Sequence, residues 1–595
     1  MNRTNKYRKK RKIRQLVFLT SIITVLILLY GVKVFILDPG NQSGSDINRH
    51  AELSEASEDE FTGKNNNSDI ENKNPDNSGT DVLNDDNQKT EEKAKFTSIQ
   101  TPSPDSVCLP SEFKLTWEII KDGENVNEYK RNYDIKFPYF SEYNALPGIT
   151  TFRGNNFRNT ASYGFADVKE EKLEQIWSLS IGRIDEWTGV GWNGQPSIVK
   201  WDEETKAIMN ILPEKKVKED LKEVIYATLD GKIYFLDIDD GSYTRDPINV
   251  GYPFKGSVTV DPRGYPLLYA GQGIEKKGGV TGKIGFRIFS LIDQEQIFFI
   301  DGMDKHAYRR WGAFDSGALI DPTTDTLVEC GENGIVYTAK LNTNYDRING
   351  SISINPEIVK YRYKSSISKR LGIENSPVAI NNYLYFIDNS GLFQCIDLNT
   401  MSPVWARNVN DDTDSSPALE ILSDSQVYVY TANEVDFQGT GGSSYMRKID
   451  ALTGKIIWEK SVVCTYSSTN GGALASPVIG KHDIENLVIF NIAKTGKGKN
   501  TGVLYALDKN TGEEVWTVDL DYYCWSSPVD VYTKDGKSYL VVCDSGGFMR
   551  LFEGATGKEL HKIPVRANVE GSPAVYENMI VVGTRGQEIL GVKIK

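Results

Sequence analysis

The strongest constraint on the fold is a unit of roughly 54 residues that recurs from about residue 151 to the C-terminus. Eight segments open with a small residue, often Ser-Pro, and a short apolar strand, as in "SSPALE" at Pro417 and "SSPVDV" at Pro528. A second β-rich run, a glycine-containing turn, a third strand and an often aromatic fourth strand follow. This pattern predicts an all-β, eight-bladed β-propeller of four-stranded blades. Seven blades are the alternative if the second unit, which carries an insertion, is misread.

The two ends of the repeat region complement each other. The last unit, "GSPAVYENMIVVGTRGQEILGVKIK", supplies three strands before the chain ends. The missing outer strand is present ahead of the first unit, as "KLEQIWSLSIG" with Trp177. A blade built from both termini leaves no open edge. We therefore expect the N- and C-terminal strands to close the ring.

The N-terminal residues indicate a membrane anchor. The first 14 residues hold eight cations and no acid, and Leu16 to Val32 is an uncharged apolar run long enough, with its flank, to span a bilayer. The cations hold the N-terminus in the cytoplasm, so the propeller is extracytoplasmic. No small-x-small cleavage site follows the run, which favours a single-pass cell-membrane protein over a cleaved signal peptide. The predicted domains are 1–14 basic cytoplasmic tail, 15–37 transmembrane helix, 38–110 disordered acidic linker, 111–150 N-terminal arm and 151–595 propeller.

The linker and the arm differ in composition. The linker is rich in Asn, Asp, Glu, Ser and Lys and has almost no aromatic residues, so it cannot bury enough apolar surface to fold. The arm contains Trp117, Phe137 and Tyr139. These side chains are expected to pack on the propeller, although the arm could instead be a small separate module.

Charge and cysteine content exclude some classes of protein. The formal net charge is −13 despite the basic tail, so the extracytoplasmic part repels phosphate backbones and nucleic acid is excluded as a partner. The six cysteines form no Cys-x-x-Cys pair and no regular framework. Cys395 and Cys543 lie in apolar strand patterns, where buried free thiols are expected.

The repeat units resemble a known family. "SSPVDV…GGFMRLFEGATGKEL" and "ASPVIG…GVLYALDKNTGEEVW" are similar to the pyrroloquinoline-quinone-type (PQQ-like) propeller repeat, and "TFRGNNFRNTASYG" resembles the segment that this family places before its first blade. The N-terminal anchor and the richness in Asn, Lys and Ile make the chain resemble a membrane-anchored bacterial member of the family. The resemblance leaves function open, because the fold serves both quinone-dependent dehydrogenases and non-enzymatic envelope proteins.

The resemblance also bears on cofactors. The family's enzymes seat their quinone on a disulfide between adjacent cysteines and on a calcium ion, whereas no two cysteines here are adjacent and no Asp/Glu/Asn set matches the calcium ligands. We therefore expect neither PQQ nor calcium. The four histidines are scattered, so we also expect no metal site and no catalytic residues.

The candidate ligand site is positional. In a propeller the inner strand of each blade begins beside the central channel, so residues just before each Ser-Pro converge at one channel mouth. Aromatic side chains with amides and carboxylates suit a sugar, a peptide or a small polar ligand. The alternative is that they satisfy one another and ordered water. The candidates are Trp192, Asn193, Gln195, Lys255, Arg310, Trp311, Asp315, Glu374, Asn375, Asp412, Asp414, Tyr522, Tyr523, Trp525, Asn568 and Glu570.

The stretch Thr151–Gly164 is predicted to be a structural latch. Its arginines are poorly placed to recruit nucleic acid in an acidic protein, and we expect them to pair with carboxylates and carbonyls of the first and last blades while the aromatic residues pack. The predicted latch residues are Phe152, Arg153, Gly154, Asn155, Arg158, Tyr163 and Trp177.

These observations predict a non-enzymatic protein of the cell envelope. Its expected role is non-catalytic binding of a protein or a cell-wall component, as a scaffold. One alternative is a ligand sensor that uses the channel mouth, and another is a quinone-dependent dehydrogenase.

Overall fold

The computed structural model describes residues 98–192, 194–464, 470–495 and 498–595. The predicted tail and transmembrane helix, and the linker up to residue 97, lie outside the described residues. Within those ranges, each helix is too short or too polar to cross a bilayer.

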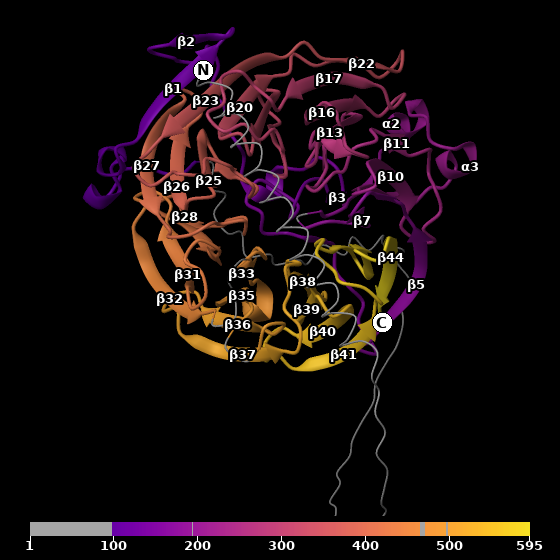
Figure 1. Ribbon diagram of the computed structural model, residues 1–595. Coiled ribbons are helices and arrows are strands. Elements are labelled where there is room, and N and C mark those ends of the chain that lie inside the picture. Colours follow the sequence, from indigo (N-terminus) through magenta and orange to yellow (C-terminus); the bar gives the residue numbers. More distant parts are fainter. Residues whose placement is uncertain (1–97, 193, 465–469, 496–497) are drawn as a thin grey trace, which may run out of the picture. The chain divides into compact units, whose positions relative to one another are not determined.

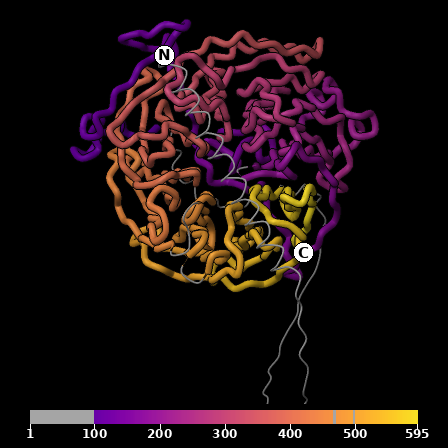
Figure 2. Tube along the Cα trace, in the orientation of Figure 1, coloured from indigo at the N-terminus to yellow at the C-terminus, as the bar shows by residue number. Residues whose placement is uncertain are grey.

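Eight sheets stand around a ring, which confirms the predicted all-β, eight-bladed propeller (Figures 1 and 2). From inner to outer strand, blade 1 holds β8 (Ser197–Lys200), β9 (Lys222–Ala227), β10 (Lys232–Asp237) and β11 (Ile248–Asn249); blade 2 holds β12 (Thr259–Val260), β13 (Leu267–Gly271), β16 (Gly285–Ser290) and β17 (Gln296–Asp301); blade 3 holds β18 (Leu319–Asp321), β19 (Thr326–Cys330), β20 (Ile335–Lys340) and β23 (Glu357–Lys364); and blade 4 holds β24 (Val378–Ile380), β25 (Tyr383–Ile387), β26 (Leu392–Asp397) and β27 (Ser402–Asn408).

The second half of the ring repeats this order. Blade 5 holds β28 (Ala418–Ser423), β29 (Gln426–Ala432), β31 (Ser443–Asp450) and β32 (Ile456–Val463); blade 6 holds β34 (Val478–Ile479), β35 (Leu487–Ala493), β36 (Gly502–Asp508) and β37 (Glu514–Leu520); blade 7 holds β38 (Val529–Tyr532), β39 (Ser538–Cys543), β40 (Phe548–Glu553) and β41 (Glu559–Pro564); and blade 8 holds β42 (Ala574–Tyr576), β43 (Met579–Thr584), β44 (Glu588–Ile594) and β5 (Leu173–Ser180).

The apolar cores lie between neighbouring blades. Middle strands such as β25 and β35 are buried at every residue, whereas the outer strand β32 alternates between exposed residues and residues that are buried or half-buried. A strand covered on both faces reads as a continuous apolar run, and a strand with one wet face alternates. In the described residues, each junction between two blades contains its own apolar cluster.

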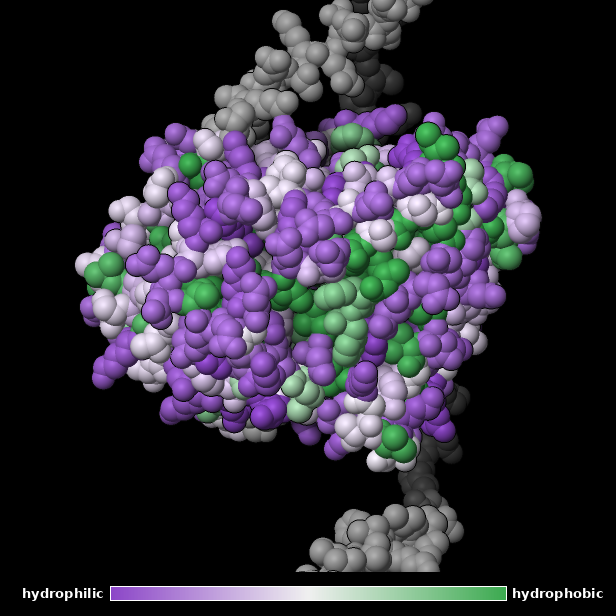
Figure 3. Space-filling model, turned by 90° about the horizontal axis from the view of Figure 1, so that it is seen from above, coloured by the Kyte–Doolittle hydropathy of each residue, from purple (hydrophilic) through white to green (hydrophobic). Residues whose placement is uncertain are grey.

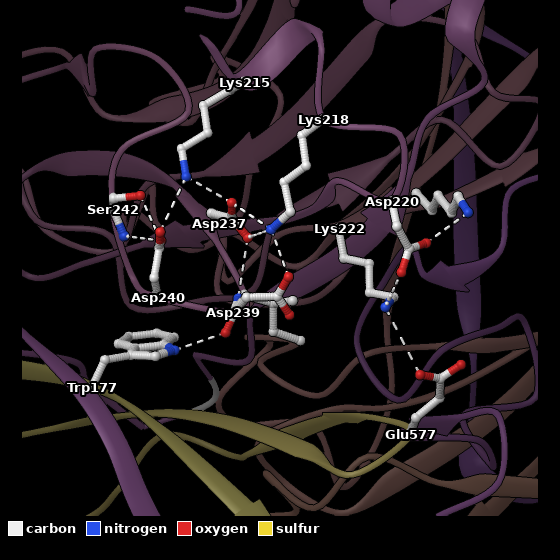
Figure 4. A network of polar contacts seen from close by, with 12 residues as sticks. Trp177, Lys215, Lys218, Asp220, Lys222, Asp237, Asp239, Asp240, Ser242 and Glu577 are labelled. Atoms are coloured by element: carbon white, nitrogen blue, oxygen red, sulfur yellow. Dashed lines mark hydrogen bonds and ion pairs between the residues drawn. The ribbon is translucent and has the colours of Figure 1, made fainter.

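Blade 8 closes the ring with strands from both ends of the repeat region, as predicted. β5 pairs antiparallel with β44, and Trp177 lies opposite Gly591. The indole N–H of Trp177 donates to the Ile238 carbonyl of blade 1 at 2.7 Å. Beside this contact, Lys222 of blade 1 approaches Glu577 of blade 8 at 3.9 Å (Figure 4).

The same tryptophan contact joins other blades. In each case the outer-strand indole N–H donates to a carbonyl of the next blade, and the ring lies against a glycine there, at a position where a Cβ would collide with the indole or be held tightly against it. The contacts are Trp405 with Ala451 and Gly454, Trp458 with Lys509 and Gly512, and Trp516 with Gly554 and Gly557.

The chain that precedes the propeller adds two strands to the outer edge of blade 3. β1 (Thr116–Lys121) pairs with β23 of blade 3, and β2 (Glu124–Val126) pairs with β1. Residues 98–110, which the sequence places in the disordered linker, lie against blade 5. There the Ser103 N–H donates to the Leu452 carbonyl, and the buried Cys108 thiol contacts the Gly454 carbonyl.

The remaining elements are short insertions. Two helices, α2 (Glu203–Ile208) and α3 (Pro213–Lys216), lie between β8 and β9, and Asp202 caps the first of them. The other elements are β6 (Arg183–Ile184) with β7 (Trp187–Thr188), β14 (Lys276–Lys277) with β15 (Val280–Thr281), β21 (Asn344–Asp346) with β22 (Ser351–Ser353), β30 (Glu434–Val435) with β33 (Gly471–Gly472), and the 3-10 turns η1 (Ser106–Cys108), η2 (Pro110–Phe113), η3 (Phe140–Glu142) and η4 (His482–Ile484).

A chain of hydrogen bonds, which we call the serine belt, explains the repeated Ser-Pro. The backbone N–H of the residue before each proline, or of its equivalent, donates to the same position of the next blade. The bonds run from Gly317 to the hydroxyls of Ser376, Ser416, Ser476, Ser527 and Ser572 in turn, then to the Gly194 carbonyl, and from Gln195 to the Ser257 hydroxyl. The residue after each belt serine, apart from Ser257, is proline, which has no backbone N–H. It therefore brings no donor that would need a partner in the channel.

The latch, residues 151–164, follows the serine belt around the inside of the ring. Just before it, β3 (Gly148–Ile149) pairs with β8 of blade 1, and at its end β4 (Ser162–Tyr163) pairs with β42 of blade 8. Between them the chain bonds the other inner strands in order, through Thr150 to Val260, Thr151 to Ala318, Asn156 to Ala379, Phe157 to Leu419, Asn159 to Lys481 and Ser162 to Asp530.

Two buried arginines anchor the latch. The Arg153 guanidinium donates to the carbonyls of Pro477 and Pro528, each at 3.0 Å, and Arg158 donates to the carbonyls of Pro377 and Gly317. Both side chains are fully buried, and burial lowers their pKa to about 10, so they stay charged at neutral pH. The expected partners were wrong, because these carbonyls belong to blades 3, 4, 6 and 7 rather than to the first and last blades.

The other predicted latch residues are buried, apart from Tyr163. Phe152, Asn155 and Trp177 are buried, whereas Tyr163 is 36% exposed. Gly154 has φ +86°, and a Cβ there would lie 1.9 Å from the Thr160 carbonyl oxygen. The latch therefore requires glycine at this turn.

We expect Arg153→Ala to destabilise the propeller far more than it changes any ligand affinity. The substitution removes the donor to three buried carbonyls, those of Arg158, Pro477 and Pro528, at about 1–3 kcal/mol each, and empties the space of a large side chain. Arg153→Lys is the matched control: it keeps the charge, but its single ammonium group cannot reproduce the guanidinium fork, so an intermediate loss is expected. Thermal unfolding of the full chain measures both, and an unchanged Tm for Arg153→Ala would contradict the latch role.

Candidate functional site

The candidate site is built at one repeated position, two residues before the serine belt. From blade 2 to blade 8 the residues there are Lys255, Asp315, Glu374, Asp414, Leu474, Trp525 and Glu570. Blade geometry fixes the backbone at this position, so the side chains differ while their placement around the channel mouth is shared. Three consecutive blades place a carboxylate there.

Six carboxylates gather on this side of the mouth, and we call them the carboxylate arc. They form two groups in which one oxygen from each member lies within 4.8 Å of the others: Asp315, Glu332 and Glu374 in the first group, and Asp412, Asp414 and Glu434 in the second. Glu374 and Asp412 are partly exposed, and the other four are buried. The arc thus reaches solvent at two points.

The first group holds a cation supplied by the chain. The Lys255 ammonium forms an ion pair with Asp315 and lies 6.0 Å from the centre of the Trp192 ring. The Arg309 guanidinium lies 3.7 Å from Glu332. These two cations offset part of the negative charge of the group.

The second group differs in its partners. Across the described ranges, no lysine or arginine forms an ion pair with Asp412, Asp414 or Glu434. The Asp414 N–H donates to Glu434 at 3.2 Å, while Asp414 Oδ1 is buried without a hydrogen-bond donor. Burial, and then the neighbouring carboxylates, raise the pKa of all three side chains well above the ordinary range. This arrangement is built to accept a proton or a cation.

An aromatic group lines another part of the mouth. The rings of Tyr523 and Trp525 lie 5.0 Å apart, with the Lys494 ammonium 5.3 Å and 5.2 Å from their centres. Tyr522 stacks on Phe548 and is 37% exposed. Trp311, at 42% exposed, is a second accessible aromatic of the predicted set.

Several predicted mouth residues serve the scaffold. Gln195 bonds the Arg153 N–H and the Pro573 carbonyl, and Asn375 bonds the carbonyls of Ile387 and Thr413. Glu570 accepts from Asn568 and pairs with Arg585 at 3.2 Å. Asn193 lies outside the described residues.

The sequence reading missed Glu332 and Glu434. Both follow the second strand of a blade, in "ECGENG" and "TANEV", and turn back toward the mouth. The signal that could have found them is the position just after the second strand, compared across repeats.

The residues do not fit the seat of a quinone. All six cysteines are buried and free, and Cys543 lies on β39 while Cys524 precedes β38. Of the described histidines, His561 is on the outer strand β41 and His482 on η4.

Comparisons with known proteins agree with this architecture. A family model described as "Outer membrane protein assembly factor BamB" matches residues 500–595. A curated protein of the same description from Kangiella koreensis is 27% identical over 202 residues, 33% of this chain. The chain covers 44% of that relative, less than half of its length.

Two solved structures align with more than two thirds of the chain. BamB from Moraxella catarrhalis is 15% identical with a TM-score of 0.42, and the alignment covers 71% of this chain and 98% of that one. Quinohemoprotein alcohol dehydrogenase ADHIIG from Pseudomonas putida HK5 is 11% identical with a TM-score of 0.48, covering 75% and 80%.

The ring of eight blades and its closure by both ends of the repeat region define the class of the molecule, an eight-bladed β-propeller. The family match over residues 500–595 and the curated relative support a PQQ-like β-propeller family.

The raised pKa values of the arc predict how stability depends on pH. The folded protein binds protons at Asp412, Asp414 and Glu434 at pH values where the unfolded chain, with carboxyl pKa values near ~4, has lost them. Stability therefore falls as pH rises through the folded pKa values and is regained on acidification toward pH ~5.

We expect Asp414→Asn to flatten this dependence and to be at least as stable as the parent at pH ~8, because it removes one buried charge from the group. Thermal unfolding of the full chain between pH ~5 and ~8 measures it. Glu186→Gln, an exposed acid outside the arc, is the control and should follow the parent curve. Parallel curves for Asp414→Asn and the parent would contradict the assignment.

Proposed function

We propose that the protein is a non-catalytic binding and scaffold protein of the cell envelope. The predicted helix at 15–37 anchors it in the cell membrane as a single-pass protein, and the extracytoplasmic propeller binds other envelope proteins. A cell-wall component is the second class of partner, and nucleic acid is excluded by the charge.

The observation that carries the proposal is the latch. Its residues bond the inner strands of consecutive blades, so at that level the channel is filled by the chain itself. A ligand or partner reaches the other side, where the mouth presents carboxylates and aromatic rings. Such a surface suits recognition rather than the seating of a buried cofactor.

The rim offers a second surface suited to a protein partner. β17 and β22 lie at the top of Figure 1, and the view from that side shows an apolar band across a mostly polar rim (Figure 3). Ile297, Phe298 and Ile352 are half-buried against the core between blades 2 and 3. Contiguous exposed apolar surface of this kind is typical of protein-binding sites.

The matched relative supports the same class of function. Its description, an outer membrane protein assembly factor, is that of a protein that acts on other envelope proteins. The alternative of a ligand sensor is favoured by the carboxylate arc, which would take the ligand at the mouth.

In-cell crosslinking of the full chain, followed by mass spectrometry, tests the proposal. We expect crosslinks from the mouth and the rim to a small set of envelope proteins. Purified protein with added quinone and calcium should show no quinone absorption band and no dye-linked alcohol or sugar oxidation. Either quinone signal, or crosslinks that are no more frequent than those of an unrelated anchored control protein, would refute the scaffold role.

A further inference from the structure

The structure contains its own example of a cation bound by the carboxylate arc. Lys255 and Asp315 occupy the same repeated position in blades 2 and 3, and the ammonium group of one forms an ion pair with the carboxylate of the other. Asp315 is 1% exposed. The mouth thus holds an ammonium group on a buried carboxylate of the next blade.

Two blades further along the ring, the acceptors recur without such a lysine. Asp414 stands at the position of Asp315, with Asp412 and Glu434 beside it. The side chain of Asp414 is 8% exposed and its Oδ1 has no donor. In the described part of the chain, no cation forms an ion pair with this group.

Among the described residues, Lys255 acts on Asp414 and Lys494 on Glu434 only through longer-range charge interactions, without an ion pair, and other cations contact other partners. Arg370 stacks on Phe437, 3.5 Å from the ring centre, and approaches Asp436 at 3.9 Å. Lys494 lies over Tyr523 and Trp525. A carboxylate group buried without a cation is costly, and a cation from outside would offset that cost.

The group is open to a side chain that arrives from solvent. Asp412 and Glu374 are partly exposed, and Phe437 nearby is 42% exposed. A long basic side chain can keep its aliphatic part at the protein surface while its charged end reaches the carboxylates. This access matches a long basic side chain.

We propose that Asp412, Asp414 and Glu434, with Glu374 at the entrance, bind the ammonium group of a lysine presented by a partner polypeptide, as Asp315 binds Lys255. The inference rests on the proposed function, because it assumes a polypeptide partner. An ammonium group offers three donors and a compact charge, which suits three converging carboxylates better than the planar fork of an arginine. The oxygens of the first carboxylate group also lie within 4.8 Å of one another, and that group holds a lysine, so such a spacing does not require a metal ion.

The test is calorimetric titration of the full chain with a short glycine peptide that carries one central lysine. The same peptide with an acetylated lysine, which keeps the length but loses the charge, is the matched ligand control. We expect the lysine peptide to bind, and acetylation or Asp414→Asn to weaken binding about ten-fold or more, a loss of about 1.4 kcal/mol. Glu186→Gln should bind as the parent does.

Asp412→Asn is the second variant, because Asp412 is less buried and its substitution disturbs the fold less. We expect the same ten-fold loss of affinity for the lysine peptide, and the Tm of the variant is measured as a control for folding. Equal binding of the acetylated peptide, or unchanged binding by both asparagine variants, would overturn the inference. Tight binding of calcium chloride that the lysine peptide does not displace would also overturn it and assign the group to a divalent cation. If both variants still bind the lysine peptide and the envelope crosslinks persist, the lysine site is rejected and the scaffold role stands.

Discussion

The eight blades depend on hydrogen bonds made at the inner edge of the ring. Each Ser-Pro in the repeat supplies a hydroxyl that accepts from the preceding blade. Four of the proline carbonyls, those of Pro377, Pro477, Pro528 and Pro573, accept from side chains at the inside of the ring. From the centre, Arg153 bridges the carbonyls of Pro477 and Pro528, and Arg158 bridges those of Pro377 and Gly317. Each guanidinium carries several donors in a rigid fork, so one side chain can join two or more blades, which no neutral side chain of that size does.

This arrangement explains why a buried arginine without a carboxylate partner is stable here. Backbone carbonyls carry partial negative charge, and several of them directed at one guanidinium replace the water that it loses on burial. Both arginines adopt left-handed backbone conformations, at φ +51° and +56°, which a non-glycine residue takes only when its surroundings hold it there. The outer tryptophans secure the blades at the rim in the same way, through one indole N–H and one glycine each.

The fold could be predicted from the sequence because each blade of a propeller is encoded by a local, repeated sequence pattern. Ser-Pro and the buried strand runs predicted the blades, and Trp177 ahead of the first repeat predicted the closure. The sequence was less informative about the site. It gathered Gln195 with Asp414, yet the first holds the scaffold and the second faces the arc, because their difference lies in contacts with distant segments. Glu332 and Glu434 were missed because turns between the second and third strands were not compared. The boundary at residue 110 was misleading because a polar, aromatic-poor segment such as 98–110 can still be held by backbone bonds to blade 5.

The equivalent positions in other blades show that the fold itself does not require the carboxylate arc. Two residues before the belt, blade 6 has Leu474 and blade 7 has Trp525, and both blades build the same serine belt and the same bonds to the latch. Packing of the blades therefore does not require the acidic residues in blades 3, 4 and 5. Because burial raises the pKa of Asp414 and Glu434, these acidic residues lower the stability of the folded protein at neutral pH. The presence of a destabilising group at the accessible mouth of the channel supports the proposed binding role of the arc.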